Sequence, residues 1–167
     1  MKSKITSTVE IIDDEEITIW RLEKDDGTEV ININKLFDED ISNCFWQDED
    51  HKFLIVEYYN WDSTEQIAII NNVGKIVRKE INSIEDYIEK QELFIINISG
   101  YGLGNEAAKY DLSTDNWKMA VIGKDGKFII PPNYDQITFK EDENIFYAEK
   151  FNSENKFKFS IDGKSLK

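Results

Sequence analysis

The sequence predicts a mainly β fold made of antiparallel hairpin units, and two observations support this prediction. Apolar runs of strand length alternate with polar turns along the whole chain. Glycines stand in several of these turns, where a positive φ would close a hairpin without steric cost. The glycines that mark them are Gly27, Gly74, Gly126 and Gly163.

Two segments repeat most clearly. Ile67–Ile70 leads through a Gly-Lys turn to a second apolar run, and Met119–Ile122 does the same. Weaker copies lie at both ends of the chain, and a third apolar strand follows each of the first three turns. We therefore expect three-strand units at roughly residues 9–60, 61–100 and 115–152, with a partial unit at 153–167. Together they would form a single domain, 1–167, packed as a curved or propeller-like β structure.

One or two short helices are expected between the strands. Asn82–Lys90 begins with a helix-capping residue and carries acids in its first turn, which favours a helix. Lys35–Asn43 and Asn105–Tyr110 are weaker candidates. Pro131-Pro132 cannot donate hydrogen bonds to a neighbouring strand, so it is expected to end one.

Composition limits the class of protein. The 167 residues are 40% hydrophobic and 13% aromatic, enough to form a core. Cys44 is the only cysteine, so no disulfide can form within the chain. The first residues lack the apolar segment of a signal peptide, and no apolar run is long enough to cross a bilayer. A cytoplasmic protein without membrane contact is expected.

The negative charge is concentrated in one third of the chain. Residues 10–65 contain 18 acidic and 4 basic residues, whereas the remainder is close to neutral, and the whole chain carries −14. Such a field attracts cationic partners and repels phosphate backbones. With a pI of about 4.5, the chain is not expected to bind nucleic acid.

The expected partner is a basic protein. Acids in the charged third would steer it, and Tyr or Trp side chains would anchor it. A tyrosine in the glycine-rich segment 99–105 is a further candidate. The residues expected at this interface are Asp38, Glu39, Asp40, Asp48, Glu49, Asp50, Tyr58, Tyr59, Trp61, Asp62 and Tyr101.

Residues 119–137, MAVIGKDGKFIIPPNYDQI, resemble the WG-repeat family. Its units consist of a strand, a Gly-Lys turn, a strand and a Pro-Pro-x-Tyr-Asp segment, which here ends at Tyr134 and Asp135. Met119-Ala120 stands where the family has Trp-Gly, and Trp117 lies two residues earlier. The resemblance implies a β-rich fold and a binding or immunity module of bacterial type.

No catalytic, cofactor or metal site is expected. Cys44 and His51 are close in sequence, but a nucleophile and its base also need an orienting group. The glycines of residues 99–105 follow a G-x-G-x-G spacing, which differs from that of dinucleotide-binding loops. No acidic segment matches the ligand pattern of a calcium-binding EF-hand loop.

Three functions remain open from the sequence. The first is a non-enzymatic immunity protein that neutralises a basic, nuclease-like toxin. The second is a β scaffold or ligand-binding module unrelated to toxins. An enzyme, which would depend on the glycine segment and the abundant carboxylates, is the third.

Overall fold

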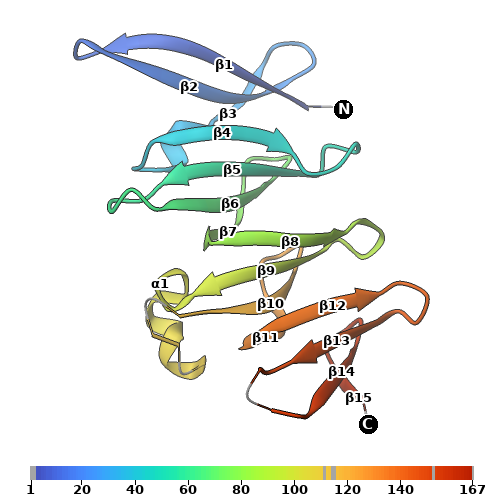
Figure 1. The fold of residues 1–167 in the computed structure, drawn as a ribbon. Coiled ribbons are helices and arrows are strands. Elements are labelled where there is room, and N and C mark those ends of the chain that lie inside the picture. Colours follow the sequence, from blue (N-terminus) through green and yellow to red (C-terminus); the bar gives the residue numbers. More distant parts are fainter. Residues whose placement is uncertain (1–2, 111, 114–115, 152, 167) are drawn as a thin grey trace. The chain divides into compact units, whose positions relative to one another are not determined.

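The computed structural model describes residues 3–110, 112–113, 116–151 and 153–166. Strands make up 59% of the chain and helices 11%, which confirms the mainly β prediction. All sheets are antiparallel, and strands that follow one another in sequence are neighbours in the sheet (Figure 1). The chain divides into two compact units, residues 1–79 and 80–167, where we expected one domain.

The first unit contains two sheets, ordered β1-β2-β3 and β4-β5-β6-β7. The 3-10 helix η1 (Ile33–Leu36) connects them. The unit ends at Lys79, within β7. The strands are β1 (Ser3–Ile12), β2 (Glu15–Lys24), β3 (Glu29–Asn32), β4 (Ile41–Trp46), β5 (Phe53–Tyr59), β6 (Glu65–Asn71) and β7 (Ile76–Ile81).

Apolar side chains from both sheets form the core of the first unit. Leu22 on β2 and Leu54 on β5 are fully buried, and Ile33 of η1 packs between the sheets. This burial is the dominant favourable contribution to folding. The buried residues of this cluster are Leu22, Ile33, Phe37, Cys44, Leu54, Val56, Tyr58, Ala68 and Ile70.

The second unit contains sheets ordered β8-β9-β10-β11 and β12-β13-β14-β15. Its helices are η2 (Glu89–Gln91), α1 (Gly100–Leu103) and η3 (Gly104–Tyr110). Phe146 and Phe159 of one sheet pack with Ile95 and Val121 of the other. The strands are β8 (Ser83–Ile88), β9 (Leu93–Ser99), β10 (Trp117–Gly123), β11 (Phe128–Tyr134), β12 (Gln136–Lys140), β13 (Ile145–Glu149), β14 (Lys156–Ser160) and β15 (Ser165–Leu166).

The same five-residue turn closes hairpins in both units. The first residue's N–H donates to the fifth residue's carbonyl at 2.9–3.0 Å, and the fourth N–H donates to the first carbonyl at 2.9 Å. The fourth residue has a positive φ in each case, as predicted for the four marker glycines. A further copy has Ser63 at that place, with φ 64°. We call this the recurring turn; its copies span residues 24–28, 60–64, 71–75, 123–127 and 160–164.

The helix predicted at Asn82–Lys90 is wrong, because most of this segment is strand β8. A bulge between Ile84 and Asp86 shifts the register against β9. The shift places Ile84 and Tyr87, which are three residues apart, on the same face of β8, opposite Ile96 and Phe94. A three-residue spacing on one face is also typical of a helix. The sheet β8-β9-β10-β11 consequently has four strands, where the sequence predicted three-strand units.

The other predicted helices had mixed outcomes. Lys35–Asn43 holds only the end of η1 before β4 begins. Asn105–Tyr110 is helical and lies within η3.

Pro131 and Pro132 lie inside β11, which corrects the expectation that they end a strand. They fall at a register shift, since Val121 pairs with Ile130 and Met119 pairs with Tyr134, and a bulge tolerates a missing N–H.

Gly163 and Gly27 differ in what surrounds their left-handed backbones. A Cβ on Gly163 would lie 2.1 Å from the carbonyl oxygen of Ile129, whereas one on Gly27 would meet nothing within 4 Å. Gly27→Ala is expected to lower the free energy of unfolding by about 1 kcal/mol, the cost of the positive φ alone. Gly163→Ala is expected to lower it by about 2 kcal/mol or more, because backbone must also move. Urea unfolding followed by circular dichroism measures both, and equal losses would contradict this account.

Candidate functional site

Three acidic segments lie at the same end of the first unit. The N–H of Tyr59, at the end of β5, donates to the carbonyl of Asp40 at 3.0 Å. Asn34 ties η1 to β2, accepting from the Trp20 N–H at 2.7 Å and donating to the Thr18 carbonyl at 3.0 Å. We call residues 13–16, 38–40 and 59–65 the acidic end. It contains nine acidic residues and neither lysine nor arginine.

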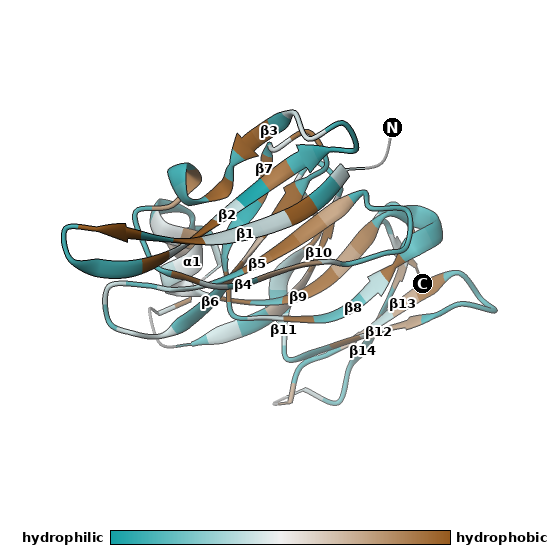
Figure 2. Ribbon diagram, turned by 90° about the horizontal axis from the view of Figure 1, so that it is seen from above, coloured by the Kyte–Doolittle hydropathy of each residue, from teal (hydrophilic) through white to brown (hydrophobic). Residues whose placement is uncertain are grey.

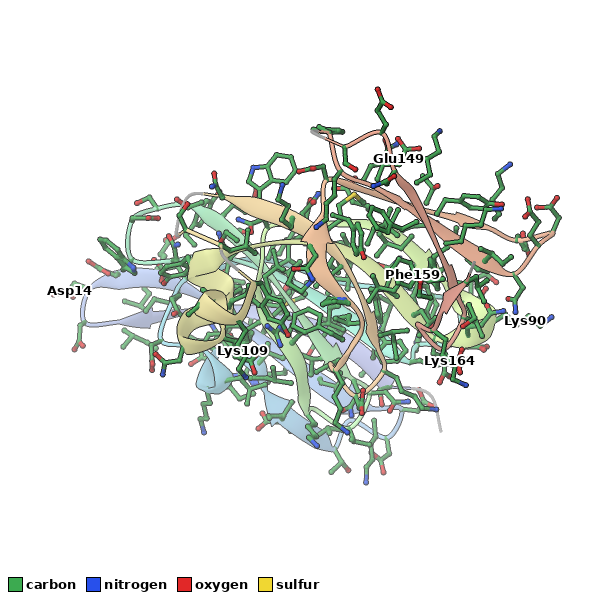
Figure 3. All side chains as sticks on the ribbon, turned by 90° about the horizontal axis from the view of Figure 1, so that it is seen from below. Asp14, Lys90, Lys109, Glu149, Phe159 and Lys164 are labelled. Atoms are coloured by element: carbon green, nitrogen blue, oxygen red, sulfur yellow. The ribbon has the colours of Figure 1, made fainter. Side chains whose placement is uncertain are left out.

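The carboxylates of the acidic end are mostly open to solvent. Asp38, Asp40 and Asp62 are exposed. Figure 3 shows Asp14 at the far end of the β1–β2 hairpin. Glu39 is held differently, because its carboxylate accepts from the Asp38 N–H at 3.1 Å and lies 3.8 Å from the Lys79 ammonium. The end therefore combines free surface charge with one internally paired carboxylate.

Trp61 is the most exposed large hydrophobic side chain of the described residues, at 81%. It occupies the second position of the recurring turn at 60–64. Asn60 holds that turn from within: it is buried, and its side-chain oxygen accepts from the N–H groups of Asp62 at 3.3 Å and Thr64 at 2.9 Å. The backbone below the indole is thus fixed, and the ring projects outward from a rigid support.

The other copies of the recurring turn show that its geometry does not require tryptophan. The second position holds Asp25, Asn72, Lys124 or Ile161 in those turns. The first three are exposed, and Ile161 packs against the core of the second unit. Since polar, charged and apolar residues all fit at this position, the fold of the turn does not explain Trp61. Exposed tryptophan on a fixed backbone is typical of a binding anchor.

Asp62 is ionised at neutral pH. Hydrogen bonds from the Thr64 side chain and N–H hold the pKa of its carboxyl below the ordinary value of 3.8. The N–H bond measures 2.9 Å. A permanent negative charge consequently stands beside the indole of Trp61.

Tyr58 and Tyr59 point to opposite faces of β5. Tyr59 is 44% exposed, whereas Tyr58 is fully buried and its ring lies 5.0 Å from that of Phe37. The prediction of Tyr58 as a contact residue is therefore corrected: it belongs to the core. The expectation that at least one of these aromatics is exposed is confirmed by Tyr59 and Trp61.

Asp48, Glu49 and Asp50 lie at the opposite end of the sheet, in the turn between β4 and β5. Asp48 accepts from the Lys52 N–H at 3.1 Å, and Asp50 lies 3.5 Å from the Lys52 ammonium. A six-residue strand places this turn roughly 20 Å from the acidic end. The predicted acids therefore do not form one patch. Sequence proximity could not reveal this separation.

Tyr101 belongs to the second unit, in α1, and is half-buried. The neighbouring glycines are explained by packing: a Cβ on Gly100 would lie 2.2 Å from the Ser113 carbonyl oxygen, and one on Gly102 would lie 2.1 Å from that of Glu80. Close backbone approach accounts for this segment without a bound phosphate. Tyr101 therefore belongs to the second unit, whereas the acidic end is defined within the first.

A polar pocket of about 280 Å³ lies in the second unit. Lys118 pairs with Asp135 across it, and Asp135 also accepts from the Phe151 N–H at 2.8 Å. Burial would raise the pKa of Asp135, but the bonds from Lys118 and Phe151 lower it overall. Asp135 therefore fastens β10 to the segment after β13, which gives the Tyr-Asp part of the WG-like motif a structural role.

Cys44 and His51 each have a structural environment of their own. Cys44 is buried on β4, and that burial, with a smaller effect from Glu57, raises the pKa of its thiol to about 12. The His51 ring stacks on Trp46 with centroids 4.7 Å apart, and its Nδ1 lies 3.0 Å from the Ser3 carbonyl oxygen. Cys44 thus contributes to the core, and His51 packs β1 against the turn between β4 and β5.

No three His, Cys, Asp or Glu side chains in the described ranges gather as a metal site. Across the same ranges, no helix has the length and apolar character needed to cross a membrane.

No protein-family model, curated protein or solved structure matches this chain. The resemblance to the WG-repeat family stays a prediction.

Trp61 and Asn60 are expected to contribute very differently to stability. Trp61→Ala removes an exposed side chain and is expected to change the free energy of unfolding by no more than about 0.5 kcal/mol. Asn60→Ala removes the acceptor that fixes the turn and is expected to cost about 1 kcal/mol or more. Thermal or urea unfolding compares them, and a large loss from Trp61→Ala would show that the ring has a structural role.

Burial is also expected to protect the Cys44 thiol. At pH 8 it should react with a thiol-specific disulfide reagent roughly a thousandfold more slowly in the folded chain than in urea, because little thiolate is present. Absorbance of the released chromophore measures both rates. Equal rates would mean that the thiol is accessible and would reopen a role for it.

Proposed function

We propose that this chain is a non-enzymatic inhibitor that binds a basic protein through the acidic end of its first unit. The finer proposal is a bacterial, cytoplasmic immunity protein that neutralises a cognate nuclease-like toxin. The observation that carries it is Trp61, exposed at 81% on a turn held by buried Asn60 and flanked by carboxylates. Tyr59 adds a second exposed aromatic side chain.

Charge and aromatic anchors would play separate parts in this binding. Exposed carboxylates attract a cationic surface at long range and raise the association rate, an effect that weakens as salt rises. A tryptophan buried in the complex mainly slows dissociation. Because the turn is already fixed, little entropy is lost in ordering it. Nuclease active sites are cationic, so this combination suits a nuclease inhibitor.

The first test is capture of a partner on the immobilised protein at low salt, followed by a wash at about 0.5 M salt and mass spectrometry. A stoichiometric basic protein is expected. If it is a nuclease, an equimolar amount of this chain should inhibit its cleavage of nucleic acid.

Two sets of matched variants locate the contact. The triple variant Asp38→Asn, Asp40→Asn, Asp62→Asn is expected to lower the association rate roughly tenfold at low salt. The control Asp48→Asn, Glu49→Gln, Asp50→Asn removes the same charge at the opposite end and should change it much less. Trp61→Ala is expected to raise the dissociation rate roughly thirtyfold. Surface plasmon resonance measures these rates.

Equal effects of the two charge sets would contradict a contact at the acidic end. Binding that ignores both salt and Trp61 would instead favour the alternative, a β scaffold or ligand-binding module unrelated to toxins.

A further inference from the structure

Strand β1 is a long edge strand that the described residues cover only at Ser3, where His51 lies against the carbonyl. In its sheet it is the outer strand, beside β2. The pairing with β2 runs from Ser3 to Ile12 without a register shift. The strand contains no proline and no bulge, and such edges are templates for pairing with another strand. Figure 2 shows that it ends in a hydrophobic stretch before a hydrophilic turn.

The geometry of the hairpin tells which backbone groups of β1 face outward. Asp13 and Asp14 both have a positive φ, 53° and 67°, which is the two-residue turn of type I′. Such a turn is closed by a hydrogen-bonded pair, here Ile12 and Glu15. Pairs alternate along the ladder, so the N–H and C=O groups of odd-numbered residues point away from β2. The Ser3 carbonyl is consistent with this assignment, because its oxygen lies against the His51 ring and not against β2.

The middle part of β1 is chemically palindromic. It reads Lys4-Ile5-Thr6-Ser7-Thr8-Val9-Glu10. Reversal about Ser7 places threonine opposite threonine, isoleucine opposite valine, and lysine opposite glutamate. Two identical antiparallel strands related by a two-fold axis at Ser7 would meet in this register.

We propose that β1 pairs antiparallel with β1 of a second copy of this chain, about a two-fold axis at Ser7. The outward groups of Ile5, Ser7 and Val9 would form about six hydrogen bonds with the other copy. Lys4 of each copy would face Glu10 of the other, giving two symmetric ion pairs. Val9, now 64% exposed, would be covered by Ile5 of the second copy.

The ion pairs are compatible with the contacts inside one chain. The Glu10 Oε1 lies 2.6 Å from the Arg21 guanidinium, and a carboxylate has a second oxygen for Lys4 of the other copy. Lys4 lies 3.4 Å from Glu23, and its ammonium carries three donors.

The negative charge of the first unit does not prevent this pairing. Segment 4–10 contains one lysine and one glutamate and is neutral. Asp13 is six residues from the two-fold axis, so the two hairpin tips would be roughly 40 Å apart. That separation exceeds the Debye length of about 8 Å at physiological ionic strength. The two acidic tips would therefore repel each other weakly.

Sedimentation equilibrium of the whole chain tests the proposal. A mass of twice 19.6 kDa is expected at micromolar concentration. Ser7→Pro should give the monomer, because the lost N–H points away from β2 and the hairpin ladder is kept. Lys4→Glu should raise the dissociation constant about tenfold, and adding Glu10→Lys should restore much of the affinity. A monomer for the unaltered chain at all concentrations would overturn the proposal.

A cross-link tests the register and does not depend on whether the proline variant folds. Ser7→Cys places two thiols opposite each other, with Cα atoms about 5.5 Å apart, and should form a disulfide-linked dimer on mild oxidation. Ile11→Cys is the matched control on the same strand and face, since its thiols would be roughly 26 Å apart. Equal cross-linking of both variants, or of Thr8→Cys in preference to Ser7→Cys, would overturn the pairing about Ser7.

Discussion

A turn that needs a left-handed residue at its fourth position is the constraint on which both units depend. It returns the chain after five residues, so the two strands that it joins pair with each other. It closes the hairpins β2–β3, β5–β6, β6–β7, β10–β11 and β14–β15, and other connections complete the meanders. Glycine meets this requirement at Gly27, Gly74, Gly126 and Gly163, and Ser63 meets it with some backbone strain. Because each hairpin closes locally, the turns do not determine how the two sheets of a unit pack together. Burial of the apolar faces of the sheets determines that packing.

The turn at residues 60–64 joins this architecture to the proposed site. Side chains alternate along β5, which places Tyr58 in the core and Tyr59 outside it. Burial of Tyr58 therefore fixes the position of the strand just before the turn begins. The side-chain oxygen of Asn60 accepts hydrogen bonds from the N–H groups of Asp62 and Thr64, within the same turn. An indole on such a support has lost most of its backbone freedom before any partner arrives, which favours slow dissociation.

Charge is distributed unevenly within the first unit, and the distribution separates two kinds of surface. Most carboxylates of the acidic end stand in loops and turns, where they are open to solvent and can act at a distance. The outer strand is neutral and offers backbone groups and short side chains, which act only in direct contact. A partner at the acidic end and a second copy at β1 would therefore use different residues and respond to different changes.

The sequence alone determined the mainly β class and the glycine turns, because strand-length apolar runs and Gly-Lys turns are local signals. It also located the charge and indicated that at least one aromatic side chain of segment 58–62 is exposed. Only the tertiary structure decided that Asp48–Asp50 lie away from Asp38–Asp40, since strand length sets which turns share an end. It likewise decided that Ser83–Ile88 is a strand, because its bulge brings Ile84 and Tyr87 to one face at a spacing that a helix would also give. Turn residues, apolar runs and charges can be read directly from the sequence. Strand register and side-chain burial are determined only when the strands pair and the sheets pack.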